Sequence, residues 1–377
     1  MYMLDRSKLL GQLDKVSRDV FHHFAKEQDI AYSVFKSIQY DETLSLQINK
    51  KKYSLLLPEW KDSLNFSRDI TQKIKEYAVL AVDGSQIYYD KHQGPGCYLI
   101  NVGTVLLDYS LPISKVDVSS YPYVFVLTDQ NREQGSTDFI NLQREEYEFE
   151  YAWQLSNHWK SKNRDKTFLT MFDGSLIFFQ LDSQGQEQKQ AFLQSYLNYL
   201  HRFYEEKILI VGYMSFPRSR ELVNILRLVL VQFDEQELEH HNVFNQLTDM
   251  DIVKFFLKPG QRSTIFKSKA PISYIYPQPL KPYFCYMHMG YEIVRLEFPA
   301  WIAQDINLVD KLCLLAYDQA QKGRGYPVCL FEAHEQAVVK GYDREFFYAM
   351  MQKKIQQQNF SLYQRSYKSL KKMNVPF

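Results

Sequence analysis

The sequence predicts an α/β fold in which a mixed β-sheet is flanked by helices. Short runs of apolar, β-favouring residues recur along the chain, and longer stretches between them carry apolar residues at helical spacing. Consecutive strand-like runs come first and an alternation of helix and strand follows, an order that favours a mixed sheet. The tripeptide Asp-Gly-Ser follows two of the strand-like runs, at 83–85 and 173–175.

Length and composition indicate a folded protein without a strong charge bias. The chain has 377 residues, of which 45% are apolar and 24% charged, so extensive disorder is not expected. The net charge of +1 excludes a protein held on nucleic acid by its overall positive charge. Any site for a polyanion must therefore be local.

The cysteines and the N-terminus bear on redox state and location. None of the four cysteines forms a Cys-x-x-Cys pair, so neither a zinc ribbon nor a redox dithiol is indicated, and we expect reduced, mostly buried thiols. The N-terminus lacks a basic-then-apolar signal, and no segment reaches the ~20 apolar residues that cross a bilayer. These features predict a cytoplasmic protein with no membrane partner.

The first part of the chain divides into a helical segment and a meander of strands. Residues 1–75 carry apolar residues at helical spacing and are expected to form a helical N-terminal extension. Strands are expected at 77–82, 97–107 and 123–127, and Gly94-Pro95-Gly96 supplies a turn between the first two. Short turns between consecutive strands predict an antiparallel meander.

Helices and strands alternate in the next part of the chain. A polar helix is expected at 137–162, a strand at 167–172, a helix at 187–204 and a strand at 207–213. Three strands, a helix, a strand, a helix and a strand give an order that resembles the ribonuclease H-like fold.

The last part of the chain is less regular. Residues 234–282 are polar and interrupted by prolines, so they are expected to be an insertion or a clamp-forming excursion outside the core. A hairpin is expected at 283–298 and a helix at 308–322, followed by a short apolar run that carries His334 ahead of a helix-like segment. The predicted division is an extension (1–75), a main domain (76–355) and a basic C-terminal tail (356–377).

The two Asp-Gly-Ser elements suggest a metal site. An aspartate that closes a buried strand has lost much of its solvation, and this cost requires a positive or hydrogen-bonding partner. Asp83 and Asp173 are therefore candidate ligands for a hard divalent cation. Ordinary turns are the alternative interpretation, because Asp and Gly are common turn formers.

A third carboxylate is expected from the helix between these strands, which offers glutamates at 145, 146, 148 and 150. Positions 148, 152, 155 and 159 form one helical stripe that is apolar except for Glu148, which makes Glu148 the choice. Glu146 and Glu150 lie on a more polar side, although a helix rotation of one residue would change the choice. His334 is a candidate ligand or proton donor, with a structural histidine as the alternative.

In this order the residues resemble the NurA nucleases of archaea and bacteria, particularly the bacterial branch, over about 77–348. The segments that carry the resemblance are Ala81-Val82-Asp83-Gly84-Ser85, the helix at 144–152, Phe172-Asp173-Gly174-Ser175-Leu176-Ile177, Gly212-Tyr213-Met214-Ser215-Phe216-Pro217-Arg218-Ser219, the hairpin at 290–299, and Gly325-Tyr326-Pro327 followed by Ala333-His334. Each segment is weak alone, and their order together is specific.

The resemblance implies a ribonuclease H-like core and a manganese-dependent DNA nuclease, with single-strand endonuclease and 5′-to-3′ exonuclease activity. It also implies a toroidal homodimer and a partner, the hexameric HerA translocase, with which such nucleases resect broken DNA ends for recombination. The family's catalytic positions fall on Asp83, Asp173, Tyr326 and His334, and its helical glutamate is assigned to Glu148.

These assignments lead to a mechanistic hypothesis with two rivals. Asp83, Glu148 and Asp173 would bind Mn²⁺, with Mg²⁺ as the alternative metal, and His334 would complete the coordination or protonate the leaving oxygen. Tyr326 would orient the phosphate or stack on a nucleotide. Arg218 and Arg220, in a cluster with Arg227, would contact the DNA backbone, and the alternative for two of these arginines is a helix-surface position paired with Glu221. The rivals are a catalytically silent ribonuclease H-like subunit that binds DNA or HerA, and a metal-dependent phosphatase.

Overall fold

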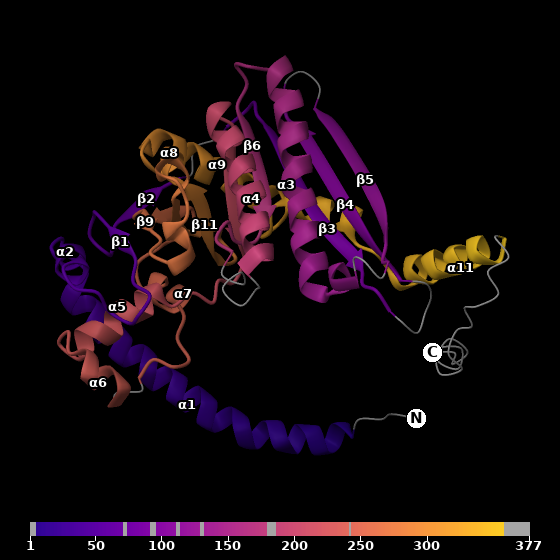
Figure 1. Ribbon diagram of the computed structural model, residues 1–377. Helices are drawn as coiled ribbons and strands as arrows, with labels where there is room; N and C mark the ends of the chain where they lie inside the picture. Colours follow the sequence, from indigo (N-terminus) through magenta and orange to yellow (C-terminus); the bar gives the residue numbers. More distant parts are fainter. Residues whose placement is uncertain are drawn as a thin grey trace. The chain divides into compact units, whose positions relative to one another are not determined.

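The computed structural model of the chain describes residues 5–70, 74–90, 96–110, 114–128, 132–178, 186–240 and 243–357. The chain packs into two compact units, each built from two separate stretches of sequence. The first unit contains residues 1–72 and 213–317, and the second unit contains residues 73–212 and 318–377. Figure 1 labels the helices and strands used below.

The second unit contains a mixed sheet. Its strands are β3 (Ala78–Ile87), β4 (Cys97–Asp108), β5 (Lys115–Val126), β6 (Phe168–Asp173) and, at the boundary along the chain, β7 (Leu209–Met214). The strand order is β7-β6-β3-β4-β5. β3, β4 and β5 form an antiparallel meander, whereas β3 and β6 are parallel. The predicted mixed sheet and its meander are therefore confirmed.

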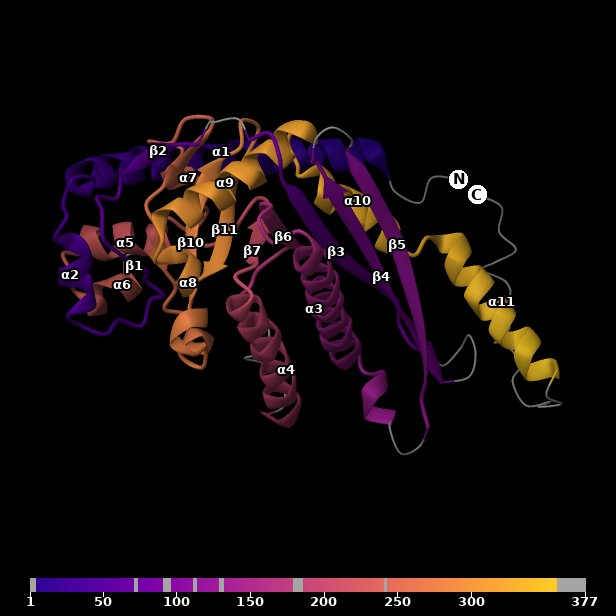
Figure 2. The same cartoon turned by 90° about the horizontal axis from the view of Figure 1, so that it is seen from above.

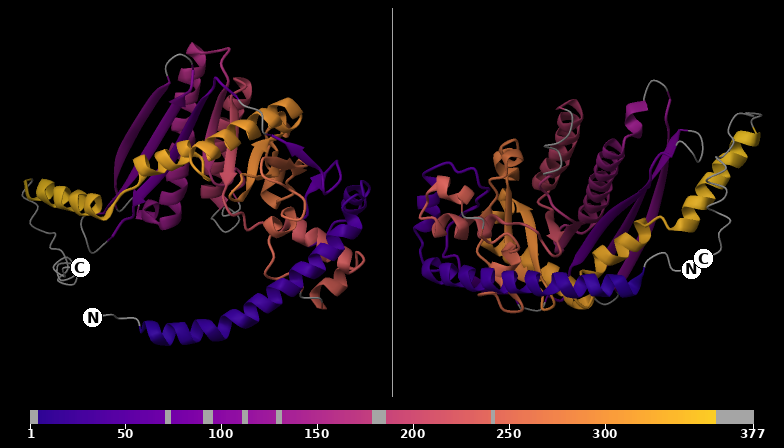
Figure 3. Two further views of the ribbon diagram at one scale, coloured as in Figure 1. Left: turned by 180° about the vertical axis from the view of Figure 1, so that it is seen from behind. Right: turned by 90° about the horizontal axis from the view of Figure 1, so that it is seen from below.

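Helices cover both faces of this sheet. α3 (Thr137–Lys162) and α4 (Gln186–Glu205) lie on one face, as Figure 1 shows, and the short η1 (Arg132–Gly135) precedes α3. Phe149 of α3 stacks on Phe172 of β6 with the ring centroids 4.3 Å apart. α10 (Val328–Ala337) crosses the opposite face, in front of the strands in the left view of Figure 3, and α11 (Gly341–Gln357) follows it. Figure 2 shows α3 and α10 on either side of the strands.

A glycine in β4 lets α10 approach the sheet closely. A Cβ atom on Gly103 would lie 2.3 Å from the backbone nitrogen of Ala337 and 2.6 Å from the carbonyl oxygen of Ala333. Both distances are too short for a Cβ atom, so α10 can pack this closely against β4 only because residue 103 is glycine. On the same face, the Cys329 sulfur contacts the Met171 sulfur at 3.6 Å.

Two strands differ in length from the expectation. β3 runs straight through Asp83, Gly84 and Ser85 to Ile87, so the first Asp-Gly-Ser does not end its strand as predicted. β5 begins at Lys115, well before the expected start at 123, because it pairs along its whole length with β4. The first residues of β5 are exposed, so this part of the strand does not form an apolar run that the sequence would reveal.

The first unit combines a second group of strands with several helices. Its strands are β1 (Glu59–Trp60), β2 (Ser67–Asp69), β8 (Gln261–Ser263), β9 (Phe266–Lys267), β10 (Pro282–His288) and β11 (Ile293–Pro299). β1, β9, β10 and β11 lie in that order, and β10 and β11 form the predicted hairpin. Its helices are α1 (Arg6–Ile38), α2 (Leu44–Asn49), α5 (Glu221–Leu230), α6 (Glu235–His240), α7 (Asp249–Val253), α8 (Ala300–Ala303), the part of α9 (Ile306–Lys322) up to Tyr317, and the 3-10 turns η3 (Pro271–Tyr274) and η4 (Gln278–Leu280).

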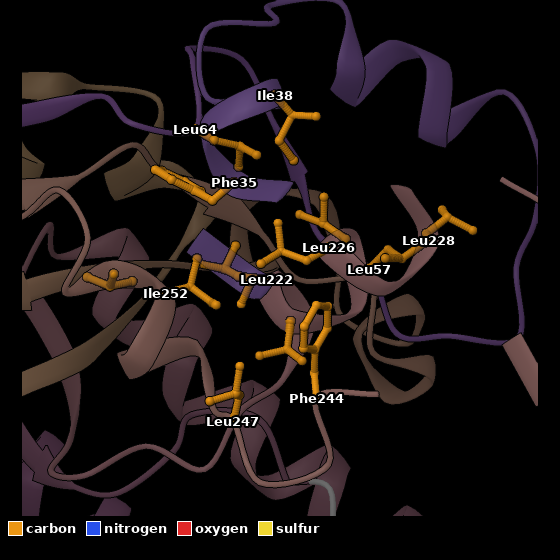
Figure 4. Packing of buried hydrophobic residues seen from close by; sticks show 14 of the residues in the cluster. Phe35, Ile38, Leu57, Leu64, Leu222, Leu226, Leu228, Phe244, Leu247 and Ile252 are labelled. Atoms are coloured by element: carbon orange, nitrogen blue, oxygen red, sulfur yellow. The ribbon is translucent and has the colours of Figure 1, made fainter. Parts of the chain in front are cut away.

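The segment 234–282 is core rather than the expected polar insertion. Phe244 and Ile252 from this segment are buried together with Phe35 of α1 and Leu226 of α5, as Figure 4 shows. Its polar residues are interspersed with buried apolar residues, and some of them, such as Asp249 and Arg262, are themselves buried, so average polarity gave the wrong expectation. The extension 1–75 likewise holds two short strands as well as helices.

Other expectations can be compared directly. All four cysteines are free and buried, as expected. Within the described ranges, no helix has both the length and the apolar character needed to cross a bilayer. The division into 1–75, 76–355 and 356–377 stays a prediction, and all but the first two residues of the basic tail lie outside the described residues.

Candidate functional site

Asp83 and Asp173 lie on neighbouring parallel strands of the second unit. The register pairs Val82 of β3 with Phe172 of β6, so the next residue on each strand is an aspartate. Neighbouring strands lie about 4.8 Å apart and residues in register project from the same face. Met171, two residues before Asp173, contacts Cys329 of α10, so both aspartates project toward the face that α10 covers.

The two Asp-Gly-Ser elements have different local structures. β6 ends at Asp173, and Gly174 then adopts a φ of 124°, a conformation that residues with side chains rarely reach. In the first element the strand continues, and the Asp83 Oδ1 accepts a hydrogen bond from the Gly84 N–H at 2.8 Å. The prediction of a strand-ending aspartate is therefore correct for Asp173 and wrong for Asp83.

His334 contacts Asp83 from α10. Its Nδ1 lies 2.8 Å from the Asp83 Oδ2, and 56% of the His334 side chain remains exposed. The apolar run that contains His334 is itself helical, so the histidine lies within α10 rather than ahead of a helix as expected. Helix α10 therefore supplies a solvent-accessible imidazole next to the first aspartate.

Glu148 approaches β3 from α3, on the face opposite α10. A Cβ atom on Gly84 would lie 2.4 Å from the Glu148 Oε1 and 2.7 Å from the Arg144 Cγ, so only glycine fits at this position. The Arg144 Nη1 donates to the Gly84 carbonyl oxygen at 3.1 Å and lies 3.1 Å from the Glu148 Oε1. The glycine of the first Asp-Gly-Ser thus admits a carboxylate and a guanidinium to the strand.

The other glutamates of α3 have different surroundings. Glu146 accepts a hydrogen bond from Ser195 of α4, and Glu150 accepts one from Gln154 at an exposed position. The Glu145 Oε1 lies 3.4 Å from the Arg144 Nη2. Of the four glutamates, Glu148 is the one that contacts the strand carrying Asp83, as the stripe of apolar positions on α3 suggested.

Burial and like charge act together on Glu148. Burial raises the pKa of Glu148 to about 8; the Arg144 guanidinium opposes the rise, and the charges of Asp83, Glu145 and Asp173 add to it. Its Oε1 is buried and accepts no hydrogen bond among the described residues, because the nearby Arg144 nitrogen is poorly aligned with it. A buried carboxylate oxygen without a hydrogen bond is costly.

Tyr326 holds the second aspartate. Its hydroxyl hydrogen-bonds the Asp173 carboxylate, which lies at an exposed position at the end of β6. Loss of water around the Asp173 carboxyl raises its pKa and the charge of Asp83 adds to this rise, while the Tyr326 hydrogen bond and His334 oppose it. Burial and the Asp173 charge raise the pKa of Tyr326, so the hydroxyl stays a hydrogen-bond donor.

The arrangement fits a hard divalent cation by its chemistry. Across the described part of the chain, no three His, Cys, Asp or Glu side chains lie close enough together to hold an ion as they stand. Asp83, Glu148 and Asp173 nevertheless supply oxygen donors, and each raises the cost of ionising another. A cation would relieve that repulsion and coordinate the Glu148 Oε1, which accepts no hydrogen bond from the described residues.

Three arginines near or outside the candidate site are Arg144, Arg218 and Arg220. Arg144 was not assigned a role, although its position four residues before Glu148 on one helix is the spacing of an ion pair. Arg218 and Arg220 belong to the first unit; Arg218 is exposed, and the Arg220 guanidinium donates to the Phe244 carbonyl oxygen at 2.5 Å. A contact of either arginine with DNA stays a prediction.

Solved structures similar to this chain include three NurA crystal structures. One is NurA with manganese, at 11% identity, a TM-score of 0.40 and coverage of 88% of this chain and 97% of that chain. Another is NurA alone, at 11% identity, a TM-score of 0.44 and coverage of 94% and 98%. The third is NurA bound to dAMP and manganese, at 12% identity, a TM-score of 0.37 and coverage of 93% and 98%.

Family membership rests on a separate comparison. Among curated proteins, none matches the chain. The family model described as NurA domain matches residues 77–339, which is well over half of the chain. This range includes all five candidate site residues and the Gly84 and Arg144 contacts described above. The chain therefore belongs to the NurA domain family.

Proposed function

We propose that the protein is a metal-dependent deoxyribonuclease whose cation is held by Asp83, Glu148 and Asp173. The observation that carries this proposal is the parallel register of β3 and β6, which aligns two aspartates on one face of the sheet, while a buried Glu148 oxygen without a hydrogen bond from the described residues reaches β3 from the other face. Membership of the NurA family supports the assignment of DNA as substrate. Manganese is named for two of the similar crystal structures, and we propose Mn²⁺, with Mg²⁺ as the alternative.

We also propose that the sheet of the second unit has the ribonuclease H-like topology. Its order β7-β6-β3-β4-β5, with an antiparallel meander followed by a parallel strand beside the first one, supports this assignment. In such an arrangement β3 and β6, the first and fourth strands in chain order, are neighbours in the sheet. This pairing explains how Asp83 and Asp173, ninety positions apart in the sequence, lie on adjacent strands.

The proposed mechanism divides the work among the side chains of the second unit. A bound divalent cation lowers the pKa of a water ligand and neutralises charge on the phosphate. Arg144 favours the ionised form of Glu148, which is the form that binds a cation. Tyr326 fixes the orientation of Asp173 through its hydrogen bond. His334, exposed and 2.8 Å from Asp83, is placed to donate a proton to the leaving oxygen.

The finer activities follow from the family resemblance. We propose single-strand endonuclease and 5′-to-3′ exonuclease activity on DNA, action at broken ends with a HerA-type hexameric ATPase, and a homodimer in the cytoplasm. Arg218 is proposed as a contact to the DNA backbone because its side chain is exposed. The Arg220 guanidinium is engaged by the Phe244 carbonyl, which leaves it a smaller role in such a contact.

Cleavage of end-labelled single-stranded DNA by the purified protein tests the proposal. We expect cleavage that requires Mn²⁺ and that is lost in Asp83→Ala and in Asp173→Ala, whereas Glu150→Gln, on the exposed side of the same helix as Glu148, keeps it. Full activity of either aspartate variant would overturn the assignment of the site.

Two additional measurements separate the rivals. Calorimetric titration with Mn²⁺ should show a site that Asp83→Ala removes, and a catalytically silent subunit would show no such site. Turnover of a nitrophenyl phosphate ester should be far slower than turnover of DNA, and the reverse order would favour a phosphatase.

A further inference from the structure

The first unit contains a cavity of about 790 Å³ that is separate from the carboxylates of the second unit. Residues 48–57, from the end of α2 onward, form one wall, and Lys269, Pro271 and Tyr274 form the other. Its volume is within the range of ligand-binding cavities, which runs from about 300 to 1,000 Å³. No function considered so far uses this cavity.

The lining is strongly basic. Lys50, Lys51, Lys52 and Lys269 contribute to it, and no Asp or Glu is among the lining residues. The first three are exposed and Lys269 is half-buried. Across the described ranges, none of the four makes an ion pair within 4.0 Å, in contrast to Lys267, whose ammonium lies 3.2 Å from the Glu59 carboxylate. In a chain of net charge +1, this is a local excess of positive charge.

Lys269 shows that the positive charge is held in place. Its ammonium donates to the Asn49 Oδ1 at 2.6 Å, a neutral acceptor that fixes the side chain without cancelling its charge. Both walls are rigidly anchored, because Ile48, Leu57 and Ile272, which belong to the wall segments, are buried. A preorganised positive charge binds an anion more strongly than a mobile surface lysine does.

Aromatic rings accompany the lysines. Tyr274 at the cavity is 68% exposed, and the Lys281 ammonium lies 5.9 Å from the centre of its ring. Tyr53 is half-buried in the opposite wall, with the Lys51 ammonium 5.5 Å from its ring centre. Exposed aromatic rings beside cationic side chains form the usual surface for single-stranded nucleic acid, in which bases stack and phosphates pair with the cations.

We propose that this cavity is a second nucleic-acid site, which binds the phosphate backbone of a single strand through Lys50, Lys51, Lys52 and Lys269 and stacks one base on Tyr274. The choice of DNA as the strand rests on the proposed function. The site itself does not, because its residues belong to the unit that lacks the candidate metal ligands.

Fluorescence anisotropy with labelled oligothymidylate tests the proposal in the full-length protein. The background is Asp83→Ala without divalent cations, so that no strand is cut. The triple variant Lys50→Gln, Lys51→Gln, Lys52→Gln should bind at least about tenfold more weakly at moderate salt. Because each phosphate contact contributes about 0.7 to the slope of log K against log salt concentration, the slope should fall by about 2.

A matched triple variant controls for overall charge. Lys61, Lys258 and Lys311 are exposed in the first unit and lie outside the cavity, so their change to Gln removes the same charge. We expect this control to bind within about twofold of the parent. Equal losses in the two triple variants would overturn the proposal, because they would show a general charge effect.

Tyr274→Ala tests the stacking separately from the charge. We expect at least about a fivefold loss of affinity with an unchanged salt slope, since one stacked base contributes about 1–3 kcal/mol, and Tyr274→Phe should retain binding. Tyr291→Ala is the control, because Tyr291 is exposed to a similar extent, at 74%, and lies outside the cavity. Competition by inorganic phosphate as strong as that by the oligonucleotide would reject a strand-binding site.

The outcome can be separated from that of the proposed function. If the wild-type protein does not cleave DNA in the presence of Mn²⁺, but binding still depends on the cavity lysines, only the nuclease assignment is rejected. Intact cleavage, with equal binding by the parent and the cavity triple variant, would reject only the second nucleic-acid site. Thermal unfolding of each variant shows whether a loss of binding has a folding cause.

Discussion

Each unit contains a group of carboxylates beside an arginine, and the hydrogen bonds of the two groups differ. In the first unit, the buried Arg295 donates to Glu297 at 2.7 Å and to Glu221 at 2.9 Å. Its guanidinium also lies 3.5 Å from the centre of the Phe284 ring. In the second unit, Arg144 lies near Glu148 without a hydrogen bond to it, and Asp83 and Asp173 add further negative charge.

Asp249 extends the contrast. Both of its oxygens accept hydrogen bonds, from the backbone N–H groups of Glu221, Leu222 and Val223 at the start of α5 and from the Tyr286 hydroxyl. This carboxylate caps a helix and has no capacity left for another ligand. Glu148 therefore has a buried oxygen that can still bind a ligand, whereas the Asp249 oxygens are already occupied by hydrogen bonds and give that carboxylate a structural role.

The largest expected difference between the two groups concerns catalysis. Asp83→Asn and Glu148→Gln remove charges that the proposed cation requires, and we expect DNA cleavage to fall by about 10²- to 10⁴-fold. Because these changes also remove repulsion, the metal-free variants should be at least as stable as the wild type. Cleavage kinetics together with urea unfolding check both statements. A marked loss of stability in Glu148→Gln would indicate that Glu148 has a structural role, as Glu221 and Glu297 do in the first unit.

The second prediction concerns the first unit. Arg295→Met leaves Glu221 and Glu297 buried without their cation, which should cost about 3–5 kcal/mol of unfolding free energy. The measurement is urea unfolding, with Arg68→Met as the control, because Arg68 is half-exposed and its partner Asp310 keeps Arg262. Equal effects of the two changes would contradict the structural role assigned to Arg295.

The third prediction concerns the space beside Asp83. Gly84→Ala places a Cβ atom 2.4 Å from the Glu148 Oε1 and 2.7 Å from the Arg144 Cγ, so these two side chains must move away from the strand, at a cost of about 1–3 kcal/mol. Cleavage should fall as well, because Glu148 moves away from Asp83. Gly341→Ala is the matched control, since nothing lies within 4 Å of its Cβ position. Unfolding and cleavage assays on both variants check this.

Much of the second unit could be predicted from the sequence because its signals are local. The bounds of α3 follow from helical periodicity, and the choice of Glu148 follows from the stripe that it shares with Ala152 and Trp159. Asp83 and Asp173 can be identified because each follows an apolar, β-favouring run in the sequence. What the sequence could not show is the parallel pairing that aligns them, since pairing depends on contacts distant along the chain.

Errors arose where tertiary packing overrides local composition. The segment 234–282 is polar on average, yet Phe244, Ile252 and Phe266 are buried in the core of the first unit. His334 lies in a short apolar run that forms helix α10, and this helix packs closely against Gly103 of β4. Gly103 in β4 is consistent with a close approach by another element, but the sequence does not show which element makes that approach.

A dependence of stability on pH also distinguishes the two groups. Burial raises the pKa of Glu148 to about 8 and that of Asp249 to about 7, so the folded protein holds a proton on each more tightly than the unfolded chain does. Stability of the metal-free protein should therefore fall as pH rises from about 4 through 8, because the unfolded state loses these protons first.

Mn²⁺ should restore the stability that ionisation of Glu148 removes, because the cation binds the ionised carboxylate, and it should leave the Asp249 contribution unchanged. Calorimetric Mn²⁺ affinity should accordingly rise with pH up to about 8 and then level off, with proton release on binding below that pH. In Glu148→Gln the rise associated with this group should disappear, whereas Asp249→Asn should leave it intact. A pH profile of Mn²⁺ affinity that is the same in wild type and Glu148→Gln would show that Glu148 is not a ligand, and would leave Asp83 and Asp173 as the only carboxylates of the proposed site.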